Sequence, residues 1–447
     1  MRSRRESALL LAMADPDARQ TATSEDRPSP RAGRSRLKSI LASVALVSAM
    51  LATAVGSASA ARDAPLVVWL SLDGVRHDYP DRGLFPALAR MERDGVRAQR
   101  LIPVFPTSTF ANHVSMATCS RVDRHGIVGN QFVDTELGVF DYGNDSRFIN
   151  TEPIWSSAER QGVRSASFFW VGSETPWRGV GATYRRSPFD SGIGEAEKVD
   201  QILAWIDLPE DERPGLVLSW WHGTDRVGHL KGPDAPEIAV QLASQAAELG
   251  RLFAGLDARN AWPFTTVVVS SDHGMTSGRI EINIASVLSD EGIESRYDSD
   301  GAVAYVTLSD RSELDRAKAA LESVAGHVVY RSDALPEDLH ITSPGRNGDL
   351  VLVAEAPHYY SRSGALSQWL GRLAQVFGGD RGTHGYAPDQ PDMAGILYML
   401  GRGVEQGSTL DAVSNLDIAP TVSRLLGIDP PADCEGKALY EIVGEVK

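Results

Sequence analysis

The sequence predicts an α/β protein with a large, mostly parallel central sheet flanked by helices. Three apolar runs, Pro65–Leu72, Gly215–Trp221 and Phe264–Ser270, contain almost no polar alternation. Runs of this kind are typical of strands buried on both faces in a covered parallel sheet. Helical segments such as Glu195–Ile206 and Ile238–Leu256 lie between or after these runs. A chain of 447 residues is long for one small domain, but an α/β fold can hold a single large core at this length.

The first predicted strand ends at a carboxylate. Asp73 stands where the run Pro65–Leu72 stops, before Gly74. In open α/β sheets, a residue at the carboxyl end of a strand lies beside the crevice where ligands bind. Capping of the following turn is the simpler interpretation of Asp73 taken by itself.

A second strand end leads into a helix start. The run Leu101–Phe105 is followed by Thr107, Ser108 and Thr109, all of which favour the first position of a helix. A Thr109 hydroxyl at this junction would lie among unpaired backbone N–H groups, where anions bind. It could attack a phosphorus atom, or it could simply cap the helix.

Other potential ligands follow the later strands. Asp225 and His229, four residues apart after Gly215–Trp221, would share one face of a helix and could bind one ion. Asp272 and His273 follow Phe264–Ser270, and charged groups seldom follow a buried strand without a partner.

Two further residues stand in loops. His384 lies in the Gly-rich loop 378–386, where it has little packing role. Asn130, in the loop after His125, could turn the chain or donate its amide to a phosphoryl oxygen.

The remaining elements complete the fold prediction. We expect a helix over Ile154–Gln161 and strands over Ser165–Val171 and Met393–Leu400, with a final helix over Ile418–Leu426. Residues 281–352 change character: short strands (302–308, 328–330 and 350–354) surround a charged helix (312–325), which indicates a small α/β insert.

The N-terminus has the features of an export signal. Lys38 precedes the apolar run Ile40–Val55, and Ala58-Ser59-Ala60 resembles a cleavage site. The run is shorter than the roughly 20 residues that a membrane-spanning helix needs. We therefore expect residues 1–60 to be a targeting segment, residues 61–447 to be one catalytic domain, and the mature protein to be secreted or periplasmic without a membrane span. An uncleaved anchor is the alternative.

Charge and cysteine content narrow the function classes. The net charge is −15 and residues 1–60 are net basic, so the predicted domain is strongly acidic. An acidic surface argues against binding nucleic-acid polymers, whereas small anions remain possible where metals reverse the local field. Two cysteines, Cys119 and Cys434, could form a disulfide or remain free thiols.

The strand-end residues suit a two-metal centre. Three carboxylates and three imidazoles match two divalent ions, most simply Zn²⁺. Two ions about 4 Å apart clamp the attacking and leaving oxygens of a displacement at phosphorus. One ion would activate the threonine hydroxyl, so no histidine base is needed. The set consists of Asp73, Thr109, Asp225, His229, Asp272, His273 and His384.

Several motifs together resemble the nucleotide pyrophosphatase/phosphodiesterase family of the alkaline phosphatase superfamily. They include Leu72-Asp73-Gly, Phe105-Pro-Thr-Ser-Thr-Phe-Ala-Asn-His113, Asp225-x-x-Gly-His229, Ser271-Asp-His-Gly274 and Gly382-Thr-His-Gly-Tyr386. They fall in family order from about Leu66 to Gly427. The resemblance implies an alkaline-phosphatase-like fold and a metal-dependent phosphodiesterase or nucleotide pyrophosphatase acting on nucleotides or small phosphodiesters.

The same resemblance implies roles for individual residues. Thr109 would form a covalent phospho-threonine. One Zn²⁺ would lie on Asp225, His229 and His384, and the other on Asp73, Asp272, His273 and Thr109. Asn130 and the Phe110 backbone N–H would hold a non-bridging oxygen, while Phe110, Tyr142 and Trp220 would line the substituent pocket.

Two other functions remain as alternatives. A phosphomonoesterase, phosphonate or phospholipid-headgroup hydrolase could use the same metal core, although aromatic residues near the site favour a diester. A non-catalytic binding module is the other, but all seven metal and nucleophile positions are intact. The oligomeric state does not follow from the sequence.

Overall fold

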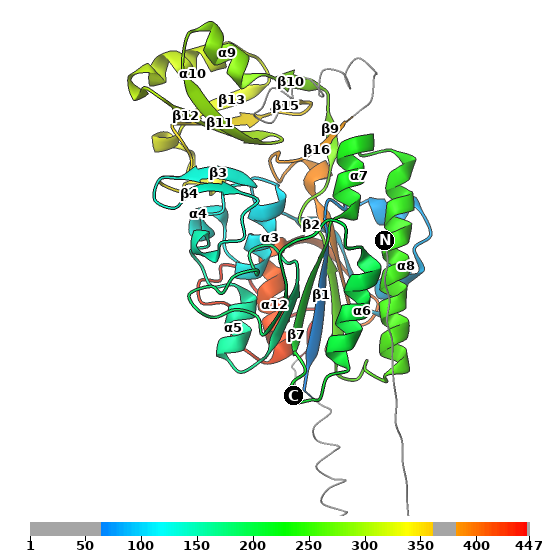
Figure 1. Ribbon diagram of the computed structural model, residues 1–447. Coiled ribbons are helices and arrows are strands. Elements are labelled where there is room, and N and C mark those ends of the chain that lie inside the picture. The colour runs from blue at the N-terminus through cyan, green and yellow to red at the C-terminus, as the bar shows by residue number, and fades with distance from the viewer. Residues whose placement is uncertain (1–63, 361–380, 445–447) are drawn as a thin grey trace, which may run out of the picture. The chain divides into compact units, whose positions relative to one another are not determined.

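A computed structural model describes residues 64–360 and 381–444, and its main element is an eight-stranded sheet (Figure 1). Every neighbouring pair in this sheet is parallel except the two pairs made by β17. The predicted mostly parallel sheet is therefore confirmed. In spatial order the strands are β18 (Ser408–Ser414), β2 (Val96–Ile102), β17 (Gly395–Gly401), β8 (Thr265–Ser270), β1 (Leu66–Leu72), β7 (Leu216–Trp221), β5 (Ser165–Phe168) and β6 (Tyr184–Arg186).

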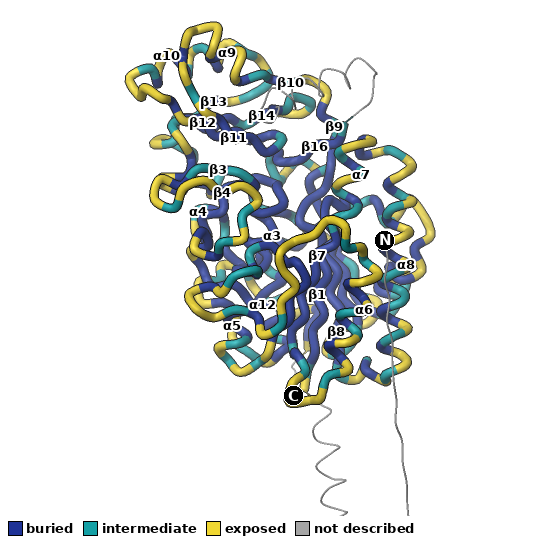
Figure 2. The backbone as a smooth tube through the Cα atoms, viewed as in Figure 1, coloured by how far each residue is buried: buried dark blue, intermediate teal, exposed yellow. Residues whose placement is uncertain are grey.

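Helices cover both faces of this sheet. Because alternate residues of a strand point to opposite faces, Val68 and Leu70 of β1 pack in one apolar cluster and Val67 and Trp69 in another. The first cluster includes residues of α2, α6 and α8, and the second includes residues of α5 and α12. Figure 2 shows the central strands as buried throughout. The helices are α2 (Pro86–Asp94), α3 (Thr109–Thr118), α4 (Val122–His125), α5 (Ile154–Arg160), α6 (Glu195–Ile206), α7 (Gly223–Lys231), α8 (Pro236–Ala258) and α12 (Ile418–Leu426).

Some elements end earlier or begin later than predicted. The strand expected over Ser165–Val171 stops at Phe168, because Phe169 has a positive φ of 65° that a strand does not accommodate. The strand expected from Met393 begins at Gly395, because the residues before it form a short 3₁₀ turn. Helices α6 and α12 have the predicted bounds.

A second, antiparallel sheet lies within residues 295–354. Its order is β11 (Ser295–Asp300), β12 (Val303–Leu308), β14 (Leu350–Ala354) and β13 (His327–Arg331). Helices α9 (Ile284–Asp290) and α10 (Leu314–Glu322) share its apolar cluster. The sequence prediction missed β11, because its sequence, Ser-Arg-Tyr-Asp-Ser-Asp, is polar although its last four residues are buried.

Three two-stranded ribbons complete the described part of the chain. The first, β9 (Thr276–Gly278) with β16 (Arg381–Thr383), leads into the loop that holds His384. The others are β10 (Ile280–Ile282) with β15 (His358–Tyr360), and β3 (Gln131–Asp134) with β4 (Gly138–Asp141).

The two cysteines form a disulfide. Cys119, at the carboxyl end of α3, is bonded to Cys434, which follows α12 and lies 315 residues further along the chain. The sequence left a free thiol open as an alternative, and that alternative is wrong.

The predicted export signal, residues 1–60, lies outside the described residues. Within residues 64–360 and 381–444, no helix combines the length and apolar character required to cross a bilayer.

Candidate active site

The predicted ligands follow the carboxyl ends of neighbouring strands. Asp73 comes directly after β1, and the pair Asp272–His273 comes shortly after β8. Helix α7, which follows β7, carries Asp225 and His229. Because β1 lies between β7 and β8 and is parallel to both, the three carboxyl ends meet at one edge of the sheet.

His384 reaches this edge through main-chain pairing. Thr383, the last residue of β16, pairs with Thr276, the first residue of β9, which begins just after the Asp272–His273 loop. The His384 ring then stacks on the His273 ring, with centroids 3.9 Å apart. Two histidines that are 111 positions apart in the numbering therefore become neighbours.

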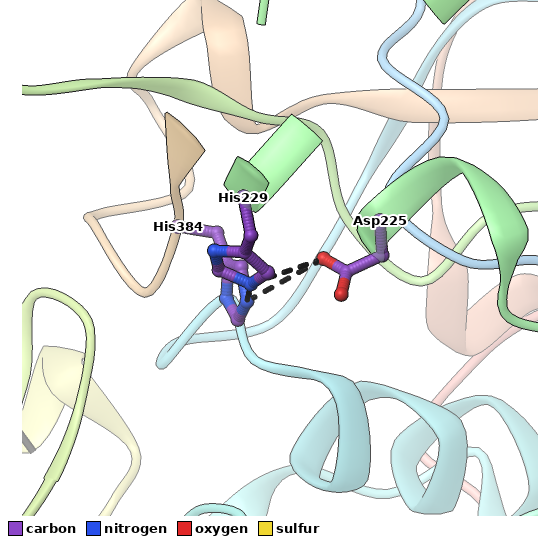
Figure 3. Close-up of side chains that lie close together, drawn as sticks. All are labelled: Asp225, His229 and His384. Carbon is purple, nitrogen blue, oxygen red and sulfur yellow. Dashed lines mark hydrogen bonds and ion pairs between the residues drawn. The ribbon is translucent and has the colours of Figure 1, made fainter. Parts of the chain in front are cut away.

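The first group of ligands consists of Asp225, His229 and His384, which converge in Figure 3. Asp225 Oδ1 lies 3.3 Å from His229 Nε2 and 3.8 Å from His384 Nε2. The two Nε2 atoms are 3.2 Å apart. These atoms are close enough to bind one cation.

Backbone carbonyls determine which ring nitrogen of each histidine faces the site. His229 Nδ1 donates to Gly382 O at 2.9 Å, His384 Nδ1 to Thr107 O at 3.0 Å, and His273 Nδ1 to Gly274 O at 2.8 Å. A carbonyl only accepts, so each neutral ring carries its proton on Nδ1 and presents an unprotonated Nε2. Two such nitrogens facing each other at 3.2 Å repel unless a cation lies between them. The tautomers therefore fit a metal centre.

The second group surrounds His273 Nε2. This atom lies 3.2 Å from Asp272 Oδ2, 3.6 Å from Asp73 Oδ1 and 3.3 Å from Thr109 Oγ1. The other oxygen of each carboxylate is held by the protein: Asp272 Oδ1 accepts from the Gly74 N–H at 3.1 Å, and Asp73 Oδ2 accepts from Trp220 Nε1 at 2.8 Å. Among the described residues, the inward oxygens Asp73 Oδ1 and Asp272 Oδ2 have no hydrogen-bond partner, so both are available to a cation.

The carboxylates of the site, Asp73, Asp225 and Asp272, favour a nearby positive charge. Burial raises the pKa of Asp73 well above its ordinary value, and the charges of Asp272 and Asp225 raise it further. Burial also raises the pKa of Asp272, whereas positive charge beside it, such as a protonated His273 or His113, lowers that pKa. Buried carboxylates are costly without a partner. Cations bound here would offset that cost.

Thr109 occupies the amino terminus of α3. It is the first residue of the helix, is 7% exposed, and follows Ser108, whose backbone is extended. The unpaired N–H groups of a helix start and the helix dipole both favour a negatively charged group. The predicted nucleophile thus lies beside the second ligand group and at an anion-binding position.

Asn130 and Phe110 contact each other. Asn130 Oδ1 accepts the Phe110 backbone N–H at 2.8 Å, and Asn130 Nδ2 donates to Asp300 Oδ1 at 2.8 Å. From the family resemblance, both the Asn130 amide and the Phe110 N–H are expected to hold a substrate oxygen. In the structure the Phe110 N–H already donates to Asn130. Asn130 Nδ2 carries two hydrogens and donates one of them to Asp300, so its second hydrogen could still donate to a substrate oxygen.

The three predicted pocket aromatics belong to two separate ring groups. Phe110 contacts Tyr142 edge-on, with centroids 5.4 Å apart, and Tyr142 is 42% exposed. Trp220 packs instead against His113 at 5.6 Å and Phe189 at 4.8 Å, besides donating to Asp73. Trp220 therefore orients the Asp73 carboxylate as well as presenting an aromatic surface.

Two further residues, His113 and Asp300, belong to this site and were not predicted from the sequence. His113 Nδ1 lies 2.9 Å from Thr109 O and 3.3 Å from Asp272 Oδ2. The spacing of four residues between Thr109 and His113 on one helix could have indicated this contact. Asp300, which binds Asn130, lies in the second sheet and had no comparable signal.

Comparison with known proteins identifies the family. Residues 67–387 match the family model described as type I phosphodiesterase / nucleotide pyrophosphatase. The chain is 30% identical over 392 residues to a pyrophosphatase/phosphodiesterase of Schizosaccharomyces pombe, covering 81% of this chain and 77% of that protein. It is 27% identical to venom phosphodiesterase 2 of Crotalus adamanteus over 82% of this chain but only 46% of that protein, so it spans less than half of that relative.

Solved structures support the same assignment. The fold is similar to murine ectonucleotide pyrophosphatase/phosphodiesterase 5, with a TM-score of 0.74 and 25% identity, covering 82% of this chain and 96% of the other. An inactive threonine-to-alanine variant of that murine protein in complex with AMP is equally similar. The predicted enzyme class, a phosphodiesterase or nucleotide pyrophosphatase, is that of the matching family. The motifs, the alkaline-phosphatase-like fold and these matches together show that the chain belongs to the type I phosphodiesterase / nucleotide pyrophosphatase family.

Proposed function

We propose that this chain hydrolyses nucleotides or related small phosphodiesters through a covalent phospho-threonine at Thr109. The observation that supports this most is the position of the Thr109 hydroxyl. Its Oγ1 lies 3.3 Å from His273 Nε2, inside a cluster of inward-facing carboxylates and imidazoles, and at the start of a helix. A nucleophile, cation ligands and an anion-binding position thus coincide.

Two zinc ions per chain are part of this proposal. Zinc binds imidazole nitrogen and carboxylate oxygen, which are the donors found in both groups. When bound, the ions would lower the pKa of the threonine hydroxyl and stabilise charge on the attacking and leaving oxygens. Asp225, His229 and His384 would hold one ion, and Asp73, Asp272, His273 and Thr109 the other.

The chain's own residues would carry two displacement steps. Thr109 Oγ1 gives its hydroxyl proton to solvent water and attacks phosphorus, so the Oγ1–P bond forms and the bond from phosphorus to the leaving oxygen breaks. The leaving oxygen takes a proton from solvent water. A second water then attacks the same phosphorus, the Oγ1–P bond breaks, and Thr109 Oγ1 takes a proton from the attacking water. Asn130 donates its remaining Nδ2 hydrogen to a non-bridging oxygen during both steps.

Aromatic surface near the nucleophile supports a diester substrate. Phe110 and Tyr142 form one pair of rings near Thr109, and Trp220 forms another surface with Phe189. A diester carries one charge fewer than a monoester and needs apolar room for its second substituent. The AMP complex of the murine relative supports a nucleoside as that substituent.

Export of the protein is also proposed. The basic and apolar segment before Ala60 has the pattern of a signal sequence. The disulfide between Cys119 and Cys434 is typical of proteins in oxidising compartments. We place the catalytic domain in residues 61–447, with residues 281–352 as its small α/β insert.

The central test compares two substrates on the purified protein. We expect kcat/KM for bis-p-nitrophenyl phosphate to exceed that for p-nitrophenyl phosphate, and metal analysis to return two zinc ions per chain. A preference for the monoester would contradict the proposal and favour a phosphomonoesterase on the same metal core.

The nucleophile is tested with a matched pair of variants in α3. Thr109→Ala should abolish turnover and the covalent adduct that mass spectrometry detects after acid quenching. Thr118→Ala is the control, because the Thr118 hydroxyl donates within the helix to Val114 O at 2.8 Å. An active Thr109→Ala protein would show that another group attacks phosphorus.

A further inference from the structure

The turn between β11 and β12 brings a buried carboxylate to the candidate active site. Asp300 is 5% exposed, and each of its two oxygens accepts a hydrogen bond from Asn130. Oδ1 accepts from Asn130 Nδ2 at 2.8 Å, and Oδ2 accepts from the Asn130 backbone N–H at 3.1 Å. The second sheet therefore contacts the loop that holds the proposed oxyanion donor.

These bonds determine the orientation of the Asn130 amide. The backbone N–H of Phe110 can only donate, so the amide oxygen of Asn130, 2.8 Å away, must face it. The NH₂ group of Asn130 must then face Asp300 Oδ1. Both contacts require the same orientation, and rotation of the amide by half a turn would break both. One Nδ2 hydrogen is left for a ligand.

The same turn also packs against the loop of His384. The Ala302 N–H donates to His384 O at 3.0 Å. A Cβ atom on Gly301 would lie 2.2 Å from His384 O, and one on Gly385 would lie 2.4 Å from Asp300 O. Both glycines have positive φ values, so neither position accommodates another residue without strain.

A third contact holds the turn in place. Tyr305 of β12 donates its hydroxyl to Val128 O at 2.6 Å, two residues before Asn130. The position of Asp300 relative to Asn130 is therefore set by the bonds of Asp300 to Asn130 and by the bond of Tyr305 to Val128. These bonds together favour a fixed contact.

We infer that Asp300 is a positioning residue for the reaction at Thr109. It fixes the Asn130 amide so that its remaining Nδ2 hydrogen donates to a non-bridging phosphoryl oxygen. Asp300 acts through Asn130 and touches no reacting atom. The inference rests on the proposed function, because it assigns a task to Asp300 only if phosphoryl transfer occurs at Thr109.

A double-mutant cycle tests this role. The variants are Asp300→Ala, Asn130→Ala and the double variant, assayed with bis-p-nitrophenyl phosphate. Loss of an oxyanion donor or of its supporting group lowers kcat by about 10- to 100-fold or more. We expect a fall of that size in kcat for each single variant, with little change in KM. The double variant should be no slower than Asn130→Ala, because Asp300 acts only through that amide.

A control variant and metal analysis exclude a general structural effect. Asp298 lies on the same strand, is 8% exposed and pairs with Arg296 at 3.1 Å. Asp298→Ala should keep the wild-type kcat. Zinc content should be equal in all variants, because the expected loss of kcat comes from the Asn130 amide and not from a displaced His384, which is a proposed zinc ligand.

Each other outcome overturns the inference. An Asp300→Ala protein with wild-type kcat, or a double variant slowed by the product of the two single effects, would exclude action through Asn130. If Asp300→Ala does not fold, the same cycle is run with Asp300→Asn, which keeps the shape and one acceptor oxygen. That variant should lose less activity and should again add nothing to Asn130→Ala, and an additive loss would refute the inference. A wild-type protein inactive on phosphodiesters would refute the proposed function as well.

Discussion

Trp220 holds the carboxylate of Asp73, a proposed metal ligand, and the removal of this tryptophan should weaken metal binding. Trp220 Nε1 donates to Asp73 Oδ2 at 2.8 Å, and both side chains are buried. In Trp220→Phe an aromatic ring remains to pack, but Asp73 loses this donor. The carboxylate is then less constrained in direction and less stabilised as an anion.

The size of the effect follows from the charge on Asp73. A hydrogen bond to an ionised group contributes about 1.5–3 kcal/mol. The apparent metal affinity should therefore fall by roughly 10- to 100-fold. Burial and the charges of Asp272 and Asp225 raise the pKa of Asp73, whereas the Trp220 N–H opposes this rise. Without that N–H, protons compete better with the metal, so the loss of affinity should grow as the pH falls.

The assay is competition for zinc between the protein and a chelating dye, which needs no substrate. Trp221→Phe is the control, because the neighbouring Trp221 donates to a neutral partner, Ser219 Oγ, at 3.1 Å. We expect Trp221→Phe to bind zinc like the wild type. Equal zinc affinities for Trp220→Phe and Trp221→Phe would show that the Asp73 contact does not support the metal site.

Three further predictions concern the metal, the pH dependence of stability and the disulfide. His229→Ala removes one of three ligands in its group and should lower the zinc content by about one ion per chain, with most activity lost; an unchanged content would refute that assignment. Burial lowers the pKa of Lys198 from 10.5 to about 8, so its ammonium destabilises the fold below pH 8 and this penalty fades as the pH rises toward 10.5. The difference in unfolding free energy between Lys198→Met and the wild type should therefore be about 2–3 kcal/mol more in favour of the variant at pH 7 than at pH 10. Denaturant titrations at the two pH values measure this difference, and a difference that does not change with pH would contradict the prediction. Replacing Cys119 and Cys434 by serine removes a disulfide between residues 315 positions apart and should reduce the unfolding free energy by about 2–5 kcal/mol. Equal unfolding free energies for the serine variant and the wild type would contradict this.

Local patterns in the sequence were enough to predict the elements that carry the ligands. The runs that became β1, β7 and β8 are buried over their whole length, and each is followed within a few residues by a proposed ligand. The spacing of Asp225 and His229 depends only on helix geometry, and α7 holds them as predicted. Patterns failed where polar residues are buried by distant partners, as in β11.

The types of the proposed ligands, their order along the chain and the family could be read from the sequence, because they depend on which residues occur and on short periodic spacing. Which ring nitrogen His229 and His384 present depends on the folded chain, because their carbonyl partners, Gly382 O and Thr107 O, lie 153 and 277 positions away in sequence. The tertiary structure also decided that the Phe110 N–H is bound by Asn130, that Asp300 orients that amide, and that the cysteines pair. Such contacts join residues up to several hundred positions apart, and no periodic pattern along a single chain records them.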